Sequence, residues 1–352
     1  MRAARRRFLK LAGAAAVVAG PAVARSAPAT PAPEFRFKLH HFVPAVAKAH
    51  ARFLLPWAKK IEAQSNGRVR LDMFPSMQLG GTPANLYDQV LKGAADIAWI
   101  VPSTTPGRFP LIETFELPFT ASARAAVNSA ALQDFAQQHL MQEFRDVRPL
   151  CFWAHDGGVI HAKKQVGKLE DLKDLRLRAP TRLAGDAVRA LGANPVSMPV
   201  PQITEGLIQR IIDGCLLPWE VVPTVRVQEL AKYHTELPGS PALYTATFVL
   251  AMNKAKYDAL PADLKAVFDA NSGKAASAVA GQLWDEEAAS ALAAIKARGN
   301  PITNVSGDEA ARWRKAIEPV TDAWVKQVKE RGHDGRKLIA AATALLAKYD
   351  KA

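Results

Sequence analysis

Residues 171–222 constrain the fold more than any other part of the 352-residue chain. Apolar residues alternate with two arginines over 175–179, which predicts a short strand with one apolar face. Pro180 ends this strand, and Thr181 is a good N-cap for a helix over 182–191. The segment therefore opens with a strand that is followed directly by a capped helix.

The rest of this segment repeats the alternation of strand and helix. It contains a strand at 195–198, a helix near 202–212 and a further apolar run at 215–218. This β-α-β-α-β order predicts a parallel sheet with crossover helices. Ligands of open α/β sheets bind outside the carboxyl ends of the strands, and Arg178 stands at such an end. A guanidinium there can bind a carboxylate through two hydrogen bonds, although most arginines of a protein are simply exposed.

Residues 1–27 have the composition of an export signal. The sequence Arg5-Arg6-Arg7-Phe8-Leu9-Lys10 fits the twin-arginine pattern R-R-x-F-L-K, and an apolar run over 11–20 follows it. Ala22-Val23-Ala24 provides an A-x-A cleavage site, with Ala27 as an alternative. A general secretory signal also begins with basic residues, but we favour the twin-arginine route, which exports proteins already folded. We expect the mature protein in the periplasm.

The charge of the mature chain is moderate. Residues 28–34 form a linker rich in proline and alanine. The leader holds six basic and no acidic residues, so its removal lowers the net charge from +13 to +7. The remaining positive charge is spread along the sequence, and no nucleic-acid partner is predicted. A basic balance suits anionic ligands, although solubility explains it equally well. No later stretch is long and apolar enough to span a membrane.

The sequence gives little sign of catalysis or of metal binding. It contains no G-x-S-x-G, H-E-x-x-H, G-x-G-x-x-G or phosphate-loop motif and no acidic cluster. Its two cysteines, Cys151 and Cys215, lie in apolar runs, so two buried free thiols are expected, with a periplasmic disulfide as the alternative. We therefore predict no catalytic residue, no metal and no cofactor.

The segment 171–222 resembles the central part of the solute-binding proteins of TRAP (tripartite ATP-independent periplasmic) transporters, the dicarboxylate-binding family. The pattern of that family is LK-x-L-x-[LIV]-R-x-P, LGA-x-P-x-x-MP and DG-x-x-x-P, separated by helices. The matching residues are Leu172, Lys173, Leu175, Leu177, Arg178, Pro180, Leu191, Gly192, Ala193, Pro195, Met198, Pro199, Asp213, Gly214 and Pro218. Further similarity at 65–81, 95–99 and 115–119 extends the resemblance to essentially the whole mature chain.

The resemblance implies a periplasmic-binding-protein-like α/β fold with two domains, mixed sheets flanked by helices and one long helix that spans both domains. Residues 274–298, which are rich in alanine and lack proline, match that helix. Such domains close on a ligand like a hinge. The chain is expected to cross between them more than once, with approximate bounds of 35–154 plus 244–283 for domain I and 155–243 plus 284–352 for domain II.

The resemblance also implies a function. Solute-binding proteins of TRAP transporters capture an organic acid and deliver it to a small and a large membrane subunit, and the arginine at the position of Arg178 binds the ligand carboxylate. We expect a monomer that performs no chemistry. A periplasmic sensor for a signalling receptor and an unrecognised periplasmic enzyme are the alternatives. Neighbouring genes for two membrane subunits would argue against the sensor, and turnover of a bound ligand would establish the enzyme.

Departures from the sialic-acid-binding members of this family indicate a less polar pocket. A second arginine of those members falls near Gly158, a glutamate near Val101, an asparagine at Leu217 and an aromatic residue at Val200. These changes predict one cationic anchor with apolar walls. A polyhydroxy acid would leave hydroxyls unpaired there, at a cost of about 1–3 kcal/mol each.

We therefore predict that the ligand is an aromatic or 2-oxo/2-hydroxy aryl monocarboxylate, held by Arg178 and packed against Trp219, Trp99 and Phe42. His41, at the end of the first predicted strand, is a further candidate contact. A small aliphatic keto acid is the second choice of ligand. Strong binding of a C4-dicarboxylate or a sialic acid would contradict the apolar pocket.

Overall fold

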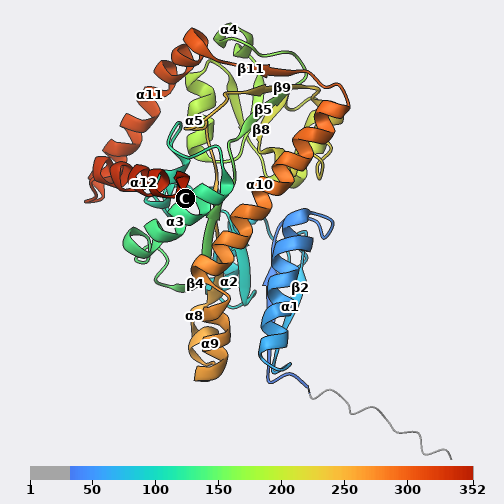
Figure 1. The fold of residues 1–352 in the computed structure, drawn as a ribbon, viewed down its shortest axis with the longest axis vertical. Helices are drawn as coiled ribbons and strands as arrows, with labels where there is room; N and C mark the ends of the chain where they lie inside the picture. Colours follow the sequence, from blue (N-terminus) through green and yellow to red (C-terminus); the bar gives the residue numbers. More distant parts are fainter. Residues whose placement is uncertain (1–31, 352) are drawn as a thin grey trace, which may run out of the picture. The chain divides into compact units, whose positions relative to one another are not determined.

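The structure, a computed structural model, describes residues 32–351, and the expected export leader at 1–27 lies outside them. Two β-sheets with helices packed around them form the described chain (Figure 1). The expected α/β class with mixed sheets is confirmed. Residues from Pro33 onward pack as one compact unit, so the domain boundaries drawn from the sequence stay a prediction.

The first sheet has five strands in the order β2-β1-β3-β10-β4. β1 pairs in parallel with β2 and β3, whereas β10 runs antiparallel between β3 and β4. A strand from late in the chain therefore completes a sheet that is otherwise built from its first half. The bounds of the strands are β1 Phe35–His40, β2 Val69–Phe74, β3 Ile97–Ile100, β4 Val147–Ala154 and β10 Thr247–Asn253.

The second sheet has six strands in the order β11-β9-β5-β8-β6-β7. β5 runs antiparallel to its neighbours β8 and β9, whereas β6 pairs in parallel with both β7 and β8. The bounds of the strands are β5 Val159–Ala162, β6 Arg176–Ala179, β7 Asn194–Ser197, β8 Gly214–Leu217, β9 Tyr233–Glu236 and β11 Ile302–Asn304.

The β-α-β-α-β order predicted for residues 171–222 is confirmed. The helices α5 Arg182–Ala190 and α6 Ile203–Ile208 connect β6, β7 and β8. Thr181 caps α5 as predicted, because its Oγ1 accepts a hydrogen bond of 3.2 Å from the backbone N–H of Ala184. The carboxyl ends of the three parallel strands consequently meet at one edge of the sheet.

Helices cover the remaining surfaces of the two sheets. Their bounds are η1 Ala49–Leu54, α1 Leu55–Gln64, η2 Pro83–Asn85, α2 Leu86–Leu91, η3 Pro102–Thr104, η4 Ile112–Glu116, α3 Ala125–His139, α4 Leu169–Leu172, η5 Val200–Gln202, η6 Trp219–Val221, α7 Val227–Leu230, α8 Lys254–Asp258, α9 Ala262–Ala270, α10 Gly273–Ala297, α11 Gly307–Glu330 and α12 Gly335–Asp350.

The long helix expected at 274–298 is α10, which passes along both sheets (Figure 1). It packs on α3 and β4 beside the first sheet and on η6 beside the second. Asp285 of α10 accepts hydrogen bonds from the backbone N–H groups of Ala125 and Ala126, at 2.6 and 3.0 Å, and so caps the start of α3. A Cβ atom on Gly281 would lie 2.7 Å from Ala126 Cα, so this close approach requires glycine.

Aromatic side chains fill the space between the first sheet and α10. The ring centroids of Trp99 on β3 and Trp153 on β4 lie 5.6 Å apart, and Trp284 of α10 lies 5.9 and 6.0 Å from them. Phe248 of β10 lies 5.4 Å from both Trp99 and Trp153. Buried aromatic clusters of this kind contribute strongly to stability, and this one fixes the positions of three residues that also line the cavity described below.

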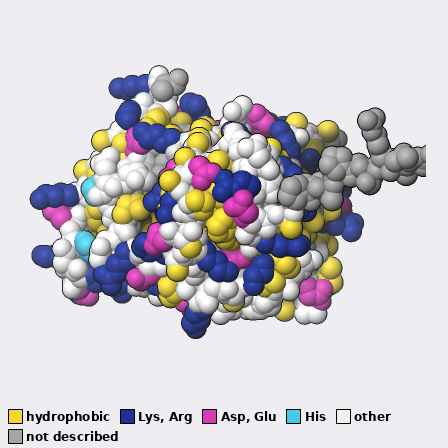
Figure 2. Space-filling view, turned by 90° about the horizontal axis from the view of Figure 1, so that it is seen from below, with side chains coloured by type: hydrophobic (Ala, Val, Ile, Leu, Met, Phe, Trp, Pro, Cys, Tyr) yellow, Lys and Arg dark blue, Asp and Glu magenta, His cyan; other side chains and the backbone are white. Residues whose placement is uncertain are grey.

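The surface has mixed charge, and no helix within residues 32–351 combines the length and the apolar character needed to cross a membrane. Figure 2 shows one face on which Lys and Arg side chains are dispersed among acidic and apolar ones. Positive charge on this face is therefore spread out.

Candidate ligand-binding site

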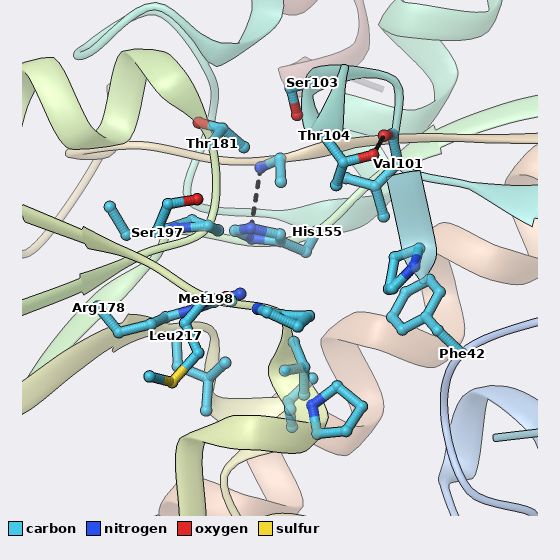
Figure 3. Close-up of a pocket in the computed structure, with 18 of the residues that line it drawn as sticks. Phe42, Val101, Ser103, Thr104, His155, Arg178, Thr181, Ser197, Met198 and Leu217 are labelled. Atoms are coloured by element: carbon cyan, nitrogen blue, oxygen red, sulfur yellow. Dashed lines mark hydrogen bonds between the residues drawn. The ribbon is translucent and has the colours of Figure 1, made fainter. Parts of the chain in front are cut away.

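A cavity of about 580 Å³ lies where strands of both sheets end. Its lining includes residues at or just after the carboxyl ends of β1, β3 and β4 in the first sheet and of β6, β7 and β8 in the second. In Figure 3, Arg178, Met198 and Leu217 lie on one side of the cavity, and Phe42 and Val101 lie on the other. This is the edge at which α/β sheets bind ligands.

Arg178 lies at the end of β6 and lines this cavity. Its side chain is 3% exposed, and it reaches over both neighbouring strands. Nε donates a hydrogen bond of 2.8 Å to the carbonyl of Met198, and Nη1 donates one of 2.9 Å to the carbonyl of Leu216. Two backbone carbonyls therefore hold the guanidinium in a fixed orientation at the cavity.

The charge of Arg178 has no partner among the described residues. Three arginines line the cavity, and the other two form ion pairs: Arg182 with Glu113 at 2.6 Å and Arg189 with Asp186 at 2.8 Å. Burial lowers the pKa of Arg178 below its ordinary value, yet an arginine keeps its proton in proteins. A buried cation without a counter-ion is costly, so this side chain is prepared for an anion that arrives in the cavity.

Tyr244 stands beside Arg178 and lines the same cavity. Its hydroxyl is buried and has no hydrogen-bond partner among residues 32–351. Burial raises its pKa well above the ordinary value, and the nearby charge of Arg178 opposes that rise. The hydroxyl is therefore a neutral donor next to the guanidinium, suited to the same carboxylate.

Gly158 lies behind Tyr244 and not in the cavity wall. A Cβ atom on Gly158 would lie 1.9 Å from Cε1 of the tyrosine ring, so only glycine leaves room for that ring. The space in which the sequence comparison placed a second arginine of other family members is occupied here by Tyr244. Gly158 thus shapes the site through Tyr244, and its direct contact with a ligand stays a prediction.

His155 follows β4 and also lines the cavity. Its Nε2 accepts a hydrogen bond of 2.8 Å from the backbone N–H of Ala246, so its Nδ1 carries the proton and donates to the carbonyl of Asp156 at 2.6 Å (Figure 3). Burial lowers the pKa of His155 to about 4. Because both nitrogens are engaged, this residue presents neutral ring carbons to the cavity.

Most of the residues predicted for the site do line this cavity. They are Phe42, Trp99, Val101, Arg178, Val200 and Leu217. The ring centroids of Phe42 and Trp99 lie 4.7 Å apart, which gives the wall opposite Arg178 two aromatic surfaces. Phe248 and Trp284 extend that wall. An aromatic ring finds favourable packing partners in such surroundings.

Trp219 and His41 do not reach the cavity wall. Trp219 turns behind β8, where its Nε1 donates a hydrogen bond of 2.6 Å to Glu236 and its ring packs between two histidines. His41 is fully buried, and its Nε2 lies 2.8 Å from Nδ1 of His50. Trp219 lies outside the lining because η6 starts at this residue and carries the next one, Glu220, into the wall, and the packing of Trp219 against a ligand stays a prediction.

The walls are also less apolar than predicted. Trp99 Nε1, Ser103 Oγ and Glu220 Oε2 belong to lining residues, and none of these buried atoms has a hydrogen-bond partner among residues 32–351. Ser103 follows β3 within the turn-rich loop, and Glu220 follows Trp219, so both stand after strand ends. That position was a usable signal for the site, whereas Val101 and Leu217 were chosen by comparison with the sialic-acid-binding members.

The described residues contain no group of three or more His, Cys, Asp or Glu side chains that could hold a metal ion. Cys151 on β4 and Cys215 on β8 belong to different sheets and are buried as free thiols, as expected. Burial raises the pKa of Cys215 to about 12, so it remains a protonated, unreactive thiol at neutral pH.

Comparisons with known proteins agree with this arrangement. Residues 39–327 match the DctP family, described as bacterial extracellular solute-binding protein, family 7. The C4-dicarboxylate-binding periplasmic protein DctP of Rhodobacter capsulatus is 25% identical over 289 residues, which is 81% of this chain and 84% of that protein.

Two solved structures are more similar. A TRAP solute-binding protein from Rhodoferax ferrireducens T118, in complex with copurified benzoate, is 42% identical, with a TM-score of 0.86 over 90% of this chain and 98% of that one. A marine metagenome TRAP solute-binding protein specific for aromatic acid ligands, in complex with 3-hydroxybenzoate, is 41% identical, with a TM-score of 0.87 over 91% of this chain and all (100%) of that one. The family match, together with the two-sheet fold and its cavity, shows that this chain belongs to the bacterial extracellular solute-binding proteins of family 7, the substrate-binding subunits of TRAP transporters.

Proposed function

We propose that this protein binds an aromatic monocarboxylate in the cavity and delivers it to the membrane subunits of a TRAP transporter. The observation that carries the proposal is Arg178, a buried guanidinium that lines the cavity and lacks a counter-ion among residues 32–351. A ligand carboxylate would supply the missing negative charge and accept hydrogen bonds from Arg178 and from the unpaired Tyr244 hydroxyl.

The shape and lining of the cavity support an aromatic body for this ligand. Its volume of about 580 Å³ lies within the usual range for small-molecule sites. Phe42, Trp99, Phe248 and Trp284 offer aromatic surfaces that a small aliphatic keto acid would leave largely uncovered. The two similar solved proteins that hold benzoate and 3-hydroxybenzoate support the same class.

Isothermal titration calorimetry on the refolded, ligand-free mature protein tests the proposal. The panel contains benzoate, mandelate, pyruvate, succinate and a sialic acid. We expect benzoate or mandelate to bind best. A ligand at a hundred times its dissociation constant should also raise the free energy of unfolding by about 2.7 kcal/mol. Arg178→Met should abolish this binding, whereas Arg176→Met, at the exposed start of the same strand and paired with Asp213, should preserve it. Preferential binding of succinate or the sialic acid would refute an aromatic ligand and leave the transport role standing.

We also propose that the protein performs no chemistry on its ligand and that it is exported by the twin-arginine route. The bound acid leaves the protein unchanged, which NMR of the ligand after prolonged incubation would check. Residues 1–27 direct export by the twin-arginine route. Replacing Arg5 and Arg6 by lysine should then retain the folded precursor in the cytoplasm, and continued export would favour a general secretory signal.

A further inference from the structure

Glu220 is an acidic side chain in the wall of a cavity built for an anion. It lies on η6 directly after β8, it lines the cavity, and it is 7% exposed. Its Oε2 has no hydrogen-bond partner among residues 32–351. Glu220 and Arg178 line the same cavity but form no ion pair, so the two groups face different parts of a ligand.

The groups around Glu220 do not neutralise it. Glu287 of α10, whose charge acts on Glu220, is itself paired with Arg52 and with Lys48, the latter at 4.0 Å. Burial, together with the charge of Glu220, raises the pKa of Asp156, which follows β4, well above its ordinary value, and its buried Oδ1 also lacks a partner among the described residues. Burial and the negative charge of Glu287 raise the pKa of Glu220 to about 8. The carboxyl therefore keeps its proton at neutral pH while the cavity is empty.

A protonated carboxyl offers one O–H donor and one carbonyl acceptor. A hydroxyl or an amino group on the ligand can complement both, because each can donate and accept a hydrogen bond. A second carboxylate would be buried without a cation of its own, because Arg178 holds the first carboxylate and the other two lining arginines, Arg182 and Arg189, are already in ion pairs. An unsubstituted ring would leave the Glu220 carboxyl unpaired, which carries a desolvation cost.

We propose that Glu220 is a specificity-determining residue, which selects aromatic monocarboxylates whose ring carries a hydroxyl or amino group and rejects those with a second carboxylate. This inference rests on the proposed function, since Arg178 has to hold the first carboxylate. The selection combines attraction and exclusion: the Glu220 carboxyl pairs with a neutral polar substituent, and a charged one finds no further unpaired arginine among the described lining residues.

The test compares ligands that differ in one ring substituent. Calorimetry on the refolded, ligand-free mature protein measures the dissociation constants of benzoate, the 3- and 4-hydroxybenzoates, the 3- and 4-aminobenzoates and the 1,3- and 1,4-benzenedicarboxylates. We expect at least one hydroxy- or aminobenzoate to bind about tenfold or more tightly than benzoate, and both dicarboxylates to bind about tenfold or more weakly. Comparing the dissociation constants of the hydroxybenzoates with those of the aminobenzoates shows which of the two substituents the site prefers.

Two variants separate recognition from a structural role. Glu220→Leu removes donor and acceptor, so the preference for the polar substituent should fall to within about threefold of benzoate. Glu220→Gln keeps a neutral donor and a neutral acceptor, so it should keep that preference. Glu205→Gln, an exposed change on α6, is the matched control and should alter neither ratio.

The outcomes distinguish this inference from the proposed function. If benzoate binds through Arg178 but the ratios are the same in wild type, Glu220→Leu and Glu220→Gln, Glu220 does not set specificity and the proposed function stands. If both variants weaken all ligands equally, Glu220 has only a structural role. If no aromatic acid binds to the wild type, the proposed function fails and this inference fails with it.

Discussion

Two regions of the second sheet bury polar side chains, and they differ in whether those groups find partners inside the protein. Behind β8, Asn300 Nδ2 donates to His234 Nε2 at 3.2 Å, and His234 Nδ1 donates to His161 Nδ1 at 2.7 Å. His161 Nε2 then donates to the carbonyl of Leu217 at 3.1 Å. In front of β8, the cavity holds Arg178 and Glu220, for which residues 32–351 provide neither a counter-ion nor a hydrogen-bonding side chain.

The comparison separates structural from functional polar groups. We call the hydrogen bonds that run from Asn300 through His234 and His161 to Leu217 the histidine chain. It gives each ring nitrogen of the two histidines one hydrogen-bond partner while both rings stay neutral, which is the arrangement that burial favours. Arg178 and Glu220 are buried at a cost in free energy and have no charged partner among the described residues. A ligand that supplies the missing partner would offset this cost. Leu217 belongs to both regions, because its side chain lines the cavity and its carbonyl ends the histidine chain.

The largest effect should come from removing the unpaired cation. Arg178→Met should weaken benzoate binding by about a hundredfold or more, because a carboxylate would then be buried without a charge partner. The ligand-free variant should unfold in urea within about 1 kcal/mol of wild type, since a costly buried charge has gone. A large loss of stability in the ligand-free variant would show that Arg178 stabilises the fold, as the buried histidines do. Arg176→Met, which breaks an exposed ion pair with Asp213, is the control.

Breaking the histidine chain should lower the stability of the ligand-free protein, which Arg178→Met should leave nearly unchanged. His161→Leu leaves His234 Nδ1 and the Leu217 carbonyl without partners, so the free energy of unfolding should fall by about 2 kcal/mol. Urea denaturation of the ligand-free protein measures this. As a control, replacing the exposed His333 by leucine (His333→Leu) should leave the free energy of unfolding unchanged. If His161→Leu were as stable as wild type, paired and unpaired buried groups would not differ in the way described.

The two regions should also give opposite dependences on pH. The folded pKa values of His161 and His234 are lowered to about 3 and about 4, mainly by burial, whereas the unfolded chain takes up these protons near pH 6.5. Their contribution is therefore complete above pH 6.5 and should decline by about 2 kcal/mol for each histidine as pH falls from 7 to 5.

Glu220 acts in the other direction. Its folded pKa of about 8 exceeds that of the unfolded chain, so its contribution to stability is lost as pH rises from about 4.5 to about 8. Glu220→Gln should make the ligand-free protein relatively more stable at pH 8 than at pH 5, compared with wild type. Urea midpoints at several pH values measure both slopes, and parallel curves for wild type and variant would contradict the burial of a protonated acid.

The smallest effect concerns the residue between the two regions. Trp219→Phe keeps an aromatic ring between His161 and His234 but removes the donor to Glu236, so a loss of about 1 kcal/mol in stability is expected. Benzoate affinity should stay within about twofold of wild type, because the indole lies behind the wall. A strong loss of affinity would restore the direct ligand contact that the sequence suggested for this tryptophan.

The sequence predicted the region in front of β8 better than the region behind it. The β-α-β-α-β order and the position of Arg178 follow from local periodicity, a proline stop and an N-cap, which act within a few residues. The pairing of His161 with His234 joins strands that meet only in the folded sheet. The direction of Trp219 depends on how η6 starts after Pro218, which no short pattern encodes.

The missed cavity residues have a similar explanation. Tyr244 reaches the cavity because Gly158, far away in the sequence, leaves space for its ring. The sequence analysis named Gly158 but not Tyr244, because their relation is a property of packing. Glu220 was hidden by the expectation that ligand-facing positions after β8 would be apolar. Its unpaired state becomes visible only when every neighbouring donor has been placed.

The two cysteines have a consequence for where this protein can be made. Cys151 and Cys215 are the whole cysteine content of the chain, and they lie apart in different sheets as buried thiols. No covalent crosslink therefore has to form before the cavity exists, and the native structure is independent of the redox state of its surroundings. Synthesis in a reducing cytoplasm and residence in an oxidising compartment make no different demands on this fold.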